Sequence, residues 1–413
     1  MNAIPVTTRP SSVSPDLVVQ DIRPWGGPPV DLHVTAGTIT DLVPRTGTQD
    51  PTDISTTRVV DGAGAVALPG FVNAHAHVDK SWWGEDWVPY GGGPGVPGRI
   101  AHERERRGAL GIPGPAPTRA LLRQMLATGT TAIRSHVDVD TGIGLQGMEV
   151  VQEAVADLDG AVEVEIVAFP QDGVLRRPGV ADLLDRAATA GAHHIGGLDP
   201  ASIDRDPVGQ IDLVFGIAER HGIGVDIHLH DGGELGAFQV ELMIDRTRRT
   251  GLQGKVNVAH GFALGDLPDS RRAGLLEGMA EVGISLTTVA AFGRPAPPLS
   301  ALTAAGIPVG LGTDGVRDLW TPYGTGDLLQ QSTQLARMTG ARDDDTLVRC
   351  ARIATSGGAW AVSRDVHDLV VGARADLVLV DARNTQDSVV RAPERSLVVS
   401  GGRIVAQDGE TLV

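Results

Sequence analysis

Residues 222–260, GIGVDIHLHDGGELGAFQVELMIDRTRRTGLQGKVNVAH, contain a short β-branched run, a stretch with helical spacing of apolar residues, and a second β-branched run. The first run ends on His228 and His230, and the second ends on His260. A strand, a helix and a second strand in this order form a unit whose two strands are parallel. The stretch therefore predicts a parallel sheet with histidines at the carboxyl ends of its strands.

The same alternation recurs along the middle of the chain. Runs of this kind predict eight strands: VALPGFVNAH, TTAIRSHVDV, VEVEIVAFP, AHHIGGL, GIGVDIHLH, KVNVAH, GISLTTV and IPVGLGTD. Stretches with helical periodicity lie between them. Eight alternating strands and helices are typical of an α/β fold of the (β/α)8, TIM-like barrel type. An open doubly wound sheet is the alternative, but no Gly-x-Gly-x-x-Gly motif opens a helix after the first strand.

The two chain ends have a different pattern, in which short segments alternate apolar and polar residues between turn signals. We expect residues 1–68 and 368–413 to form a small β-sandwich domain together, with Gly401-Gly402 as a hairpin turn. Residues 69–367 would then form the barrel.

The composition is that of a globular protein with a strong negative charge. The chain has 413 residues, a formal net charge of -16 and one cysteine, which excludes an intramolecular disulfide. The charge disfavours nucleic acid and anionic membranes as partners. The sequence has no signal-peptide pattern and no apolar run of about 20 residues, so we expect a cytoplasmic protein with a small-molecule partner.

One connection, residues 81–117, is much longer than the others and is rich in Gly and Pro. It follows the first predicted strand, on the face where barrel enzymes hold their active sites. Connections of this length are often functional. We expect a lid that closes Trp82, Trp83 and Trp87 over the substrate, in preference to a plain contact between subunits.

Residues that can bind a metal end four of the predicted strands. His75 and His77 end the first, His228 and His230 the fifth, His260 the sixth and Asp314 the eighth. Each one alone is more readily explained as an ordinary polar residue at the mouth of a barrel. Because the carboxyl ends of barrel strands converge on one site, we expect the whole group to form a metal centre.

Imidazoles with one carboxylate suit a divalent transition ion that keeps one position for water. Zinc is the expected ion, with iron or manganese as alternatives. The fourth predicted strand, in residues 192–200, has no lysine that could bridge two ions, so we expect one ion per chain. Such an ion lowers the pKa of water, and Asp314 can also accept the proton that this water loses.

Five motifs resemble those of the amidohydrolase superfamily, in particular its cytosine deaminase-like branch, which includes N-isopropylammelide amidohydrolase. They span nearly the whole chain: PGFVNAHAHVDK (69–80), AFPQDG (168–173), DIHLHDGGELGAFQVE (226–241), AHGFALGD (259–266) and GTDGVRDLWTPYGTGDLLQ (312–330).

The resemblance implies a role for each of the candidate residues. The metal ligands would be His75, His77, His228 and Asp314. His260 would lie beside the ion and hold the attacking water or the oxyanion.

Further residues implied by the resemblance would contact the substrate. Gln171 would bind an amide edge of a heterocycle, and Lys80, His230 and Trp320 would line the pocket. Asp231 stands where cytosine deaminases have a glutamate that transfers protons, and it is one methylene shorter. His230 or Glu234 could replace it.

A second difference from the family follows the last metal ligand. The resemblance implies an acid there, and this chain has Gly315. We expect the pocket to lose a charge and gain volume, which would make cytosine a poor substrate and favour larger rings.

The predicted function is hydrolytic deamination of an amino- or alkylamino-substituted nitrogen heterocycle by metal-activated hydroxide. Hydrolysis of a cyclic or acyclic amide or carbamate is the alternative, because it needs the same hydroxide. A catalytically silent binding protein is a second alternative, which the intact ligand set disfavours. Members of this family often self-associate, so we expect a homo-oligomer.

Overall fold

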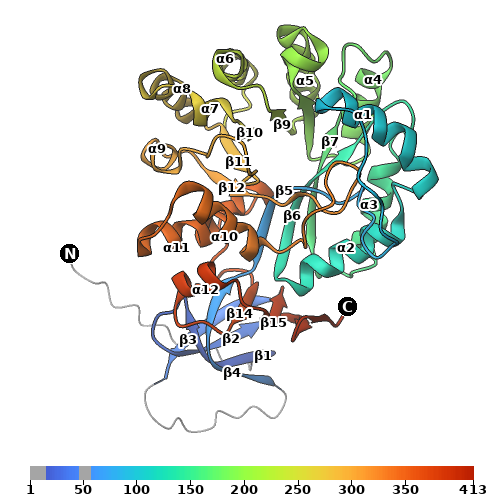
Figure 1. Cartoon of the computed structure of the whole chain (residues 1–413). Helices are drawn as coiled ribbons and strands as arrows, with labels where there is room; N and C mark the ends of the chain where they lie inside the picture. Colours follow the sequence, from blue (N-terminus) through green and yellow to red (C-terminus); the bar gives the residue numbers. More distant parts are fainter. Residues whose placement is uncertain (1–14, 46–56) are drawn as a thin grey trace.

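The structure, a computed structural model, describes residues 15–45 and 57–413. Its middle part is a barrel of parallel strands surrounded by helices (Figure 1). The barrel strands are β5 (Phe71–His77), β6 (Thr130–Asp138), β7 (Glu163–Phe169), β8 (His194–Leu198), β9 (Gly224–Leu229), β10 (Val256–His260), β11 (Ser285–Thr288), β12 (Val309–Leu311) and β13 (Asp314–Gly315). β12 pairs with β11 and β13 pairs with β5, so the chain from 309 to 315 joins the two ends of the sheet. The predicted barrel is confirmed.

Helices follow the strands along the chain and cover the outside of the barrel (Figure 1). They are α1 (Gly95–Arg106), α2 (Pro115–Ala127), α3 (Gln146–Ala156), α4 (Val180–Thr189), α5 (Pro207–His221), α6 (Gly233–Thr250), α7 (Ala263–Asp266), α8 (Asp269–Val282), α9 (Leu299–Ala304), α10 (Leu328–Thr339) and α11 (Asp344–Ile353). The ends of α5 have local causes. The side chain of Asp206 accepts a hydrogen bond from the backbone N–H of Gly209, and Gly222 ends the helix at a φ of 68°.

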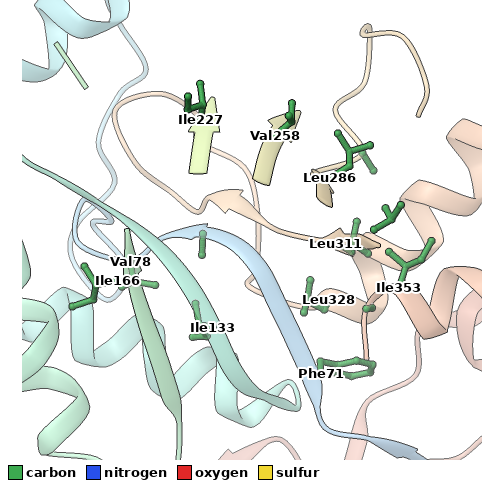
Figure 2. Packing of buried hydrophobic residues seen from close by; sticks show 14 of the residues in the cluster. Phe71, Val78, Ile133, Ile166, Ile227, Val258, Leu286, Leu311, Leu328 and Ile353 are labelled. Carbon is green, nitrogen blue, oxygen red and sulfur yellow. The ribbon is translucent and has the colours of Figure 1, made fainter. Parts of the chain in front are cut away.

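The apolar core lies between the strands and these helices. Strand pairing places Ile227 opposite Val258, and Val258 opposite Leu286 (Figure 2). Since neighbouring residues of a strand point to opposite faces, His228 lies on the other face, toward the barrel interior. The apolar residues that hold the strands thus also orient the metal-binding candidate.

The strands of both chain ends form one eight-stranded sheet, drawn in blue and dark red in Figure 1. In chain order they are β1 (Leu17–Pro24), β2 (Val30–Thr35), β3 (Thr38–Pro44), β4 (Arg58–Pro69), β14 (Leu377–Val380), β15 (Arg395–Ser400), β16 (Arg403–Gln407) and β17 (Glu410–Thr411), with α12 (Thr385–Arg391) between β14 and β15. β14 pairs with β4 and so joins the two ends. The predicted turn at Gly401-Gly402 connects β15 and β16, with positive φ at both glycines.

The predicted terminal β domain is therefore present. Its boundaries at residues 68 and 368 stay a prediction, and residues 1–14 and 46–56 lie outside the described part of the chain. Among the described residues, no helix combines the length and the hydropathy needed to cross a membrane.

Candidate active site

The structure gathers the predicted metal ligands at the carboxyl ends of β5 and β9 and at the first residue of β13. The Nε2 atoms of His75 and His77 lie 3.6 and 3.4 Å from Oδ1 of Asp314. Nε2 of His228 lies 3.3 Å from Nε2 of His77. Ligand atoms at 2.0–2.1 Å from a tetrahedral ion are about 3.3 Å from one another. The separations therefore match those of a first coordination shell.

The chemistry of these groups also fits a metal ion. Both ring nitrogens of His75, and Nδ1 of His77 and of His228, are buried without a hydrogen-bond partner among the described residues. Burial lowers the pKa of His77 to about 4 and that of His228 well below its usual range. Neutral imidazoles have a free lone pair, and unsatisfied buried nitrogens are rare unless a ligand occupies the space between them. The residues present are therefore suited to hold a divalent ion.

Asp314 carries the negative charge of this cluster. Burial would raise the pKa of its carboxyl group, but hydrogen bonding to His75 and His77 outweighs burial and holds that pKa well below its usual range. Its side chain keeps 41% of its surface accessible because it faces a cavity. The carboxylate is thus ionised and open to a small molecule.

Left-handed backbone directs two of the side chains into the site. Strand pairing sets Asp314 beside Ala76, which alternates with His75 and His77 and so faces away from them. Asp314 has a φ of 61°, and this left-handed conformation breaks the alternation. His260, which pairs with Leu229, has a φ of 68°. Such conformations in residues other than Gly persist where the surrounding structure enforces them, often at functional sites.

His136, at the end of β6, also belongs to the cluster. Its ring centroid lies 4.2 Å from that of His75 and 4.5 Å from that of His228, and neither of its nitrogens has a hydrogen-bond partner among the described residues. It forms a second possible metal-binding group with His75 and His228. The sequence places it at the end of the second predicted strand, as a candidate to support the metal ligands.

His230 and His260 stack beside the cluster, with ring centroids 4.4 Å apart. Asp199 accepts hydrogen bonds from Nδ1 and from the backbone N–H of His230, at 2.8 and 2.6 Å. Burial alone would lower the pKa of His230, but Asp199 outweighs it and raises that pKa. Neither nitrogen of His260 has a hydrogen-bond partner within the described part of the chain, and burial holds the pKa of His260 well below its usual range.

The predicted substrate contacts Lys80, Gln171 and Trp320 all line the cavity beside the metal-binding cluster. This cavity has a volume of about 180 Å³, and its wall also includes His77, Phe169, Leu198, His228, His230, His260, Asp314, Gly315, Asp318 and Thr321. A second cavity of about 350 Å³ shares His230, His260, Asp314 and Trp320 with it.

Lys80 is buried among acids that the sequence did not single out. Its Nζ lies 2.8 Å from Oδ1 of Asp138 and 3.4 Å from Oε1 of Glu103, and it donates to Oε1 of Gln171 at 2.9 Å. Burial would lower the pKa of Lys80, but these carboxylates outweigh it and raise that pKa. Trp320 donates from its indole Nε1 to Oε2 of Glu103 at 2.6 Å. Lys80 is thus a fixed cation that orients Gln171.

The structure does not bring Asp231 or Glu234 to the cavity. The carboxylate of Asp231 accepts hydrogen bonds from Ser202 and from Gln239. Glu234 is paired with Arg271 on the outer surface. His230 is the one of the three proton-transfer candidates that lines the cavity.

Gly315 does not enlarge the cavity, contrary to our expectation. An ideal Cβ on Gly315 would lie 1.8 Å from Oδ2 of Asp318, so the carboxylate of Asp318 occupies the space beside the glycine. The expected loss of a charge and gain of a side-chain volume are therefore wrong. The chain returns an acid to this place from three residues further on, and the signal in the sequence was that Asp318 lies within the motif of residues 312–330.

The expected closure by the three tryptophans is wrong as well. Trp82 is buried with Val88, Ile112 and Leu319, whereas Trp87 is 65% exposed. The lining of the two cavities includes no tryptophan of this connection among the described residues. Helix α1, within the same connection, does reach the second cavity.

Comparison with known proteins agrees with this geometry. Residues 58–406 match the profile of the Amidohydrolase family. The chain belongs to the amidohydrolase family.

Individual amidohydrolases resemble the chain over most of its length. The crystal structure of N-isopropylammelide isopropylaminohydrolase from Burkholderia multivorans is 43% identical, with a TM-score of 0.90 and coverage of 96% of this chain and 99% of that one. N-isopropylammelide isopropyl amidohydrolase from Pseudomonas sp. (strain ADP) is 27% identical, over 84% of this chain and 88% of the relative. Pterin deaminase from Rhizobium rhizogenes is 26% identical, over 91% and 87%.

Proposed function

We propose that this amidohydrolase is a metal-dependent hydrolase that removes an amino or alkylamino group from a nitrogen heterocycle. The observation that carries the proposal is the set of buried, unpartnered imidazole nitrogens next to the carboxylate of Asp314. Relatives named for N-isopropylammelide and for pterin support a nitrogen heterocycle as the substrate.

His75, His77, His228 and Asp314 would hold one divalent ion, with zinc first and iron or manganese as alternatives. Three imidazoles and one carboxylate are a donor set that zinc prefers. When bound, such an ion supplies a water molecule that is acidic enough to act as the nucleophile at neutral pH.

Residues of the chain would move the protons. Asp314 accepts a proton from the attacking water and returns it to the leaving amine, because its carboxylate is ionised and faces the cavity. His230, as the imidazolium, donates a proton to the ring nitrogen in place of Asp231, and it regains a proton from the added hydroxyl group as the amine leaves. Asp199 supports this role because it accepts a hydrogen bond from Nδ1 and raises the pKa of His230, so that the imidazolium can donate from Nε2. His260 binds the oxygen that is added to the ring carbon.

The cavity wall would bind and orient the ring. Gln171 offers its amide to a polar edge, and Lys80 fixes the orientation of that amide. Trp320 and Phe169 provide aromatic surface. Most of these contacts would be present before and during the reaction, so we expect them to affect KM more than kcat.

Release of ammonia or amine by the metal-loaded protein tests the proposal. The panel consists of aminopyrimidines, aminotriazines, pterins and cyclic amides, with the metal-free protein as control. We expect at least one amino heterocycle to be hydrolysed only by the metal-loaded form. Turnover of cyclic amides or carbamates alone would favour the alternative activity, and metal binding without any turnover would favour a binding protein.

Three further expectations remain predictions. The net charge of -16 supports a small-molecule partner over nucleic acid. We also expect a cytoplasmic location and a homo-oligomeric state.

A further inference from the structure

The carboxylate of Asp318 has one engaged oxygen and one free oxygen. Its Oδ1 accepts hydrogen bonds from the backbone N–H groups of Trp320 and Thr321, both at 2.8 Å. No described residue donates a hydrogen bond to Oδ2, although the residue is only 4% exposed. Asp318 lines the cavity of about 180 Å³. It therefore presents a fixed, unused acceptor beside the metal-binding cluster.

Gln171 supplies the matching donor in the same cavity. The ammonium group of Lys80 can only donate, so the atom of Gln171 that lies 2.9 Å from it must be the carbonyl oxygen. The amide Nε2 of Gln171 is thus free to donate, because no described residue accepts a hydrogen bond from it. In the cavity wall Asp318 can thus accept a hydrogen bond and Gln171 can donate one. A ligand that carries an N–H group next to a C=O group complements this pair.

We propose that Asp318 accepts a hydrogen bond from a ring N–H of the substrate and thereby selects oxo-substituted amino heterocycles. Such rings carry a lactam N–H for Asp318 and a neighbouring carbonyl oxygen for Gln171. The inference rests on the proposed function and adds a residue that determines specificity.

Gly315 is the second part of this arrangement. Any side chain at 315 would meet Oδ2 of Asp318, at 1.8 Å from an ideal Cβ. Either residue 315 or residue 318 can therefore fill this place, but not both. The glycine permits the acid to reach the cavity from the following loop.

Binding of a product-like ring tests the inference without turnover. The probes are uracil, which alternates N–H and C=O groups, and 1,3-dimethyluracil, which has the same ring without N–H. Calorimetry with the metal-loaded protein at about pH 8 keeps Asp318 ionised, because burial raises the pKa of Asp318 to about 7. In Asp318→Asn, Oδ1 can still accept both backbone N–H groups, and only the free atom changes from acceptor to donor.

We expect uracil to bind wild type more tightly than 1,3-dimethyluracil does. Asp318→Asn should weaken uracil binding about 10- to 100-fold, which corresponds to one hydrogen bond to a charged group. Equal affinity of wild type and Asp318→Asn for uracil, or no preference of wild type for uracil, overturns the inference.

Asp327→Asn is the matched control. Oδ1 of Asp327 also accepts two backbone N–H groups, from Leu329 and Gln330, and the residue is 7% exposed. Its other oxygen is paired with Arg395 and does not line the cavity. This variant should keep the uracil affinity of wild type.

Gly315→Ala is a second variant, which keeps Asp318 but forces its carboxylate to move. It should also lose affinity for uracil, and an unchanged affinity contradicts the geometry. If uracil binding depends on Asp318 while the panel of amino heterocycles is not hydrolysed, this inference stands and the proposed function fails. If the panel is hydrolysed but uracil binding does not depend on Asp318, only this inference fails.

Discussion

Asp199 holds His230 by two hydrogen bonds, one from the backbone N–H at 2.6 Å and one from Nδ1 at 2.8 Å. Asp199 follows β8, and His230 follows β9. The pair therefore joins two neighbouring strands at the mouth of the barrel. It fixes the position of the imidazole and favours its protonated form.

Asp199→Asn should lower kcat about 100-fold or more with little change in KM, because a neutral amide no longer stabilises the positive charge of the His230 imidazolium. Asp185→Asn is the control. Asp185 forms a similar pair with His221 at 3.1 Å on the surface, and its loss should leave kcat unchanged. Steady-state kinetics on the best substrate of the panel measures both. A change in KM alone for Asp199→Asn would contradict the assigned role.

His77→Ala and His136→Ala distinguish the two possible metal-binding groups. One group consists of His75, His136 and His228, and the other contains His75, His77 and Asp314. The expected ligand set adds His228 to the second group, because its Nε2 lies 3.3 Å from Nε2 of His77. We expect elemental analysis to find one divalent ion per chain in wild type and in His136→Ala, and none in His77→Ala. Two ions in wild type, or loss of the ion only in His136→Ala, would refute the assignment.

Asp314→Asn should keep the fold and abolish turnover. Asparagine tolerates the left-handed backbone at this position, where φ is 61°, and its amide oxygen can still approach an ion. It cannot accept the proton from water, so kcat should fall about 10²- to 10⁴-fold. Circular dichroism and elemental analysis verify fold and metal content, and near wild-type turnover would exclude Asp314 as the base.

His230→Ala should reduce kcat strongly, whereas Asp231→Ala should be nearly silent. Only His230 lines the cavity, and the carboxylate of Asp231 is held by Ser202 and Gln239. The two variants are compared under identical conditions with the same substrate. The reverse result would return the proton transfer to Asp231 and require a rearrangement of its carboxylate.

The sequence predicted the residues whose place depends on local pattern. His75, His77 and His228 directly end apolar runs, and a residue at the end of a barrel strand lies at the active-site face in every such fold. The strands and the metal ligands could therefore be predicted from the sequence together. Helices α10 and α11 were not among the predicted elements, although each has an N-cap aspartate, Asp327 and Asp343.

Residues whose position depends on tertiary contacts could not be predicted from the local sequence pattern. The resemblance to cytosine deaminases suggested Asp231, but the chain turns into α6 there and directs the carboxylate toward Ser202. Asp199 reaches His230 from another strand, 31 residues away. Asp318 returns to the place beside Gly315 only because the backbone of the following loop binds its Oδ1.

The stability of Asp318→Asn relative to wild type should increase as the pH rises. Burial raises the pKa of Asp318 from 3.8 to about 7, and the nearby charge of Lys80 offsets this only in part. Between these values the folded protein keeps a proton that the unfolded chain has released. The carboxyl group therefore contributes stability below about pH 4, and this contribution is lost as the pH rises through about 7.

Above that pH the ionised carboxylate costs the fold up to about 4 kcal/mol relative to an uncharged group. The Tm of Asp318→Asn minus that of wild type should thus increase from about pH 4.5 to 7 and then level off. Scanning fluorimetry with excess metal at each pH measures this difference, because metal binding itself shifts Tm. Asp327→Asn, which breaks the pair with Arg395, should lower Tm instead. A Tm difference that does not depend on pH would show that the carboxyl group of Asp318 in wild type ionises normally. The expected rise would show that the ionised acid destabilises the fold. Substrate binding would then explain why the chain has an acid at this position.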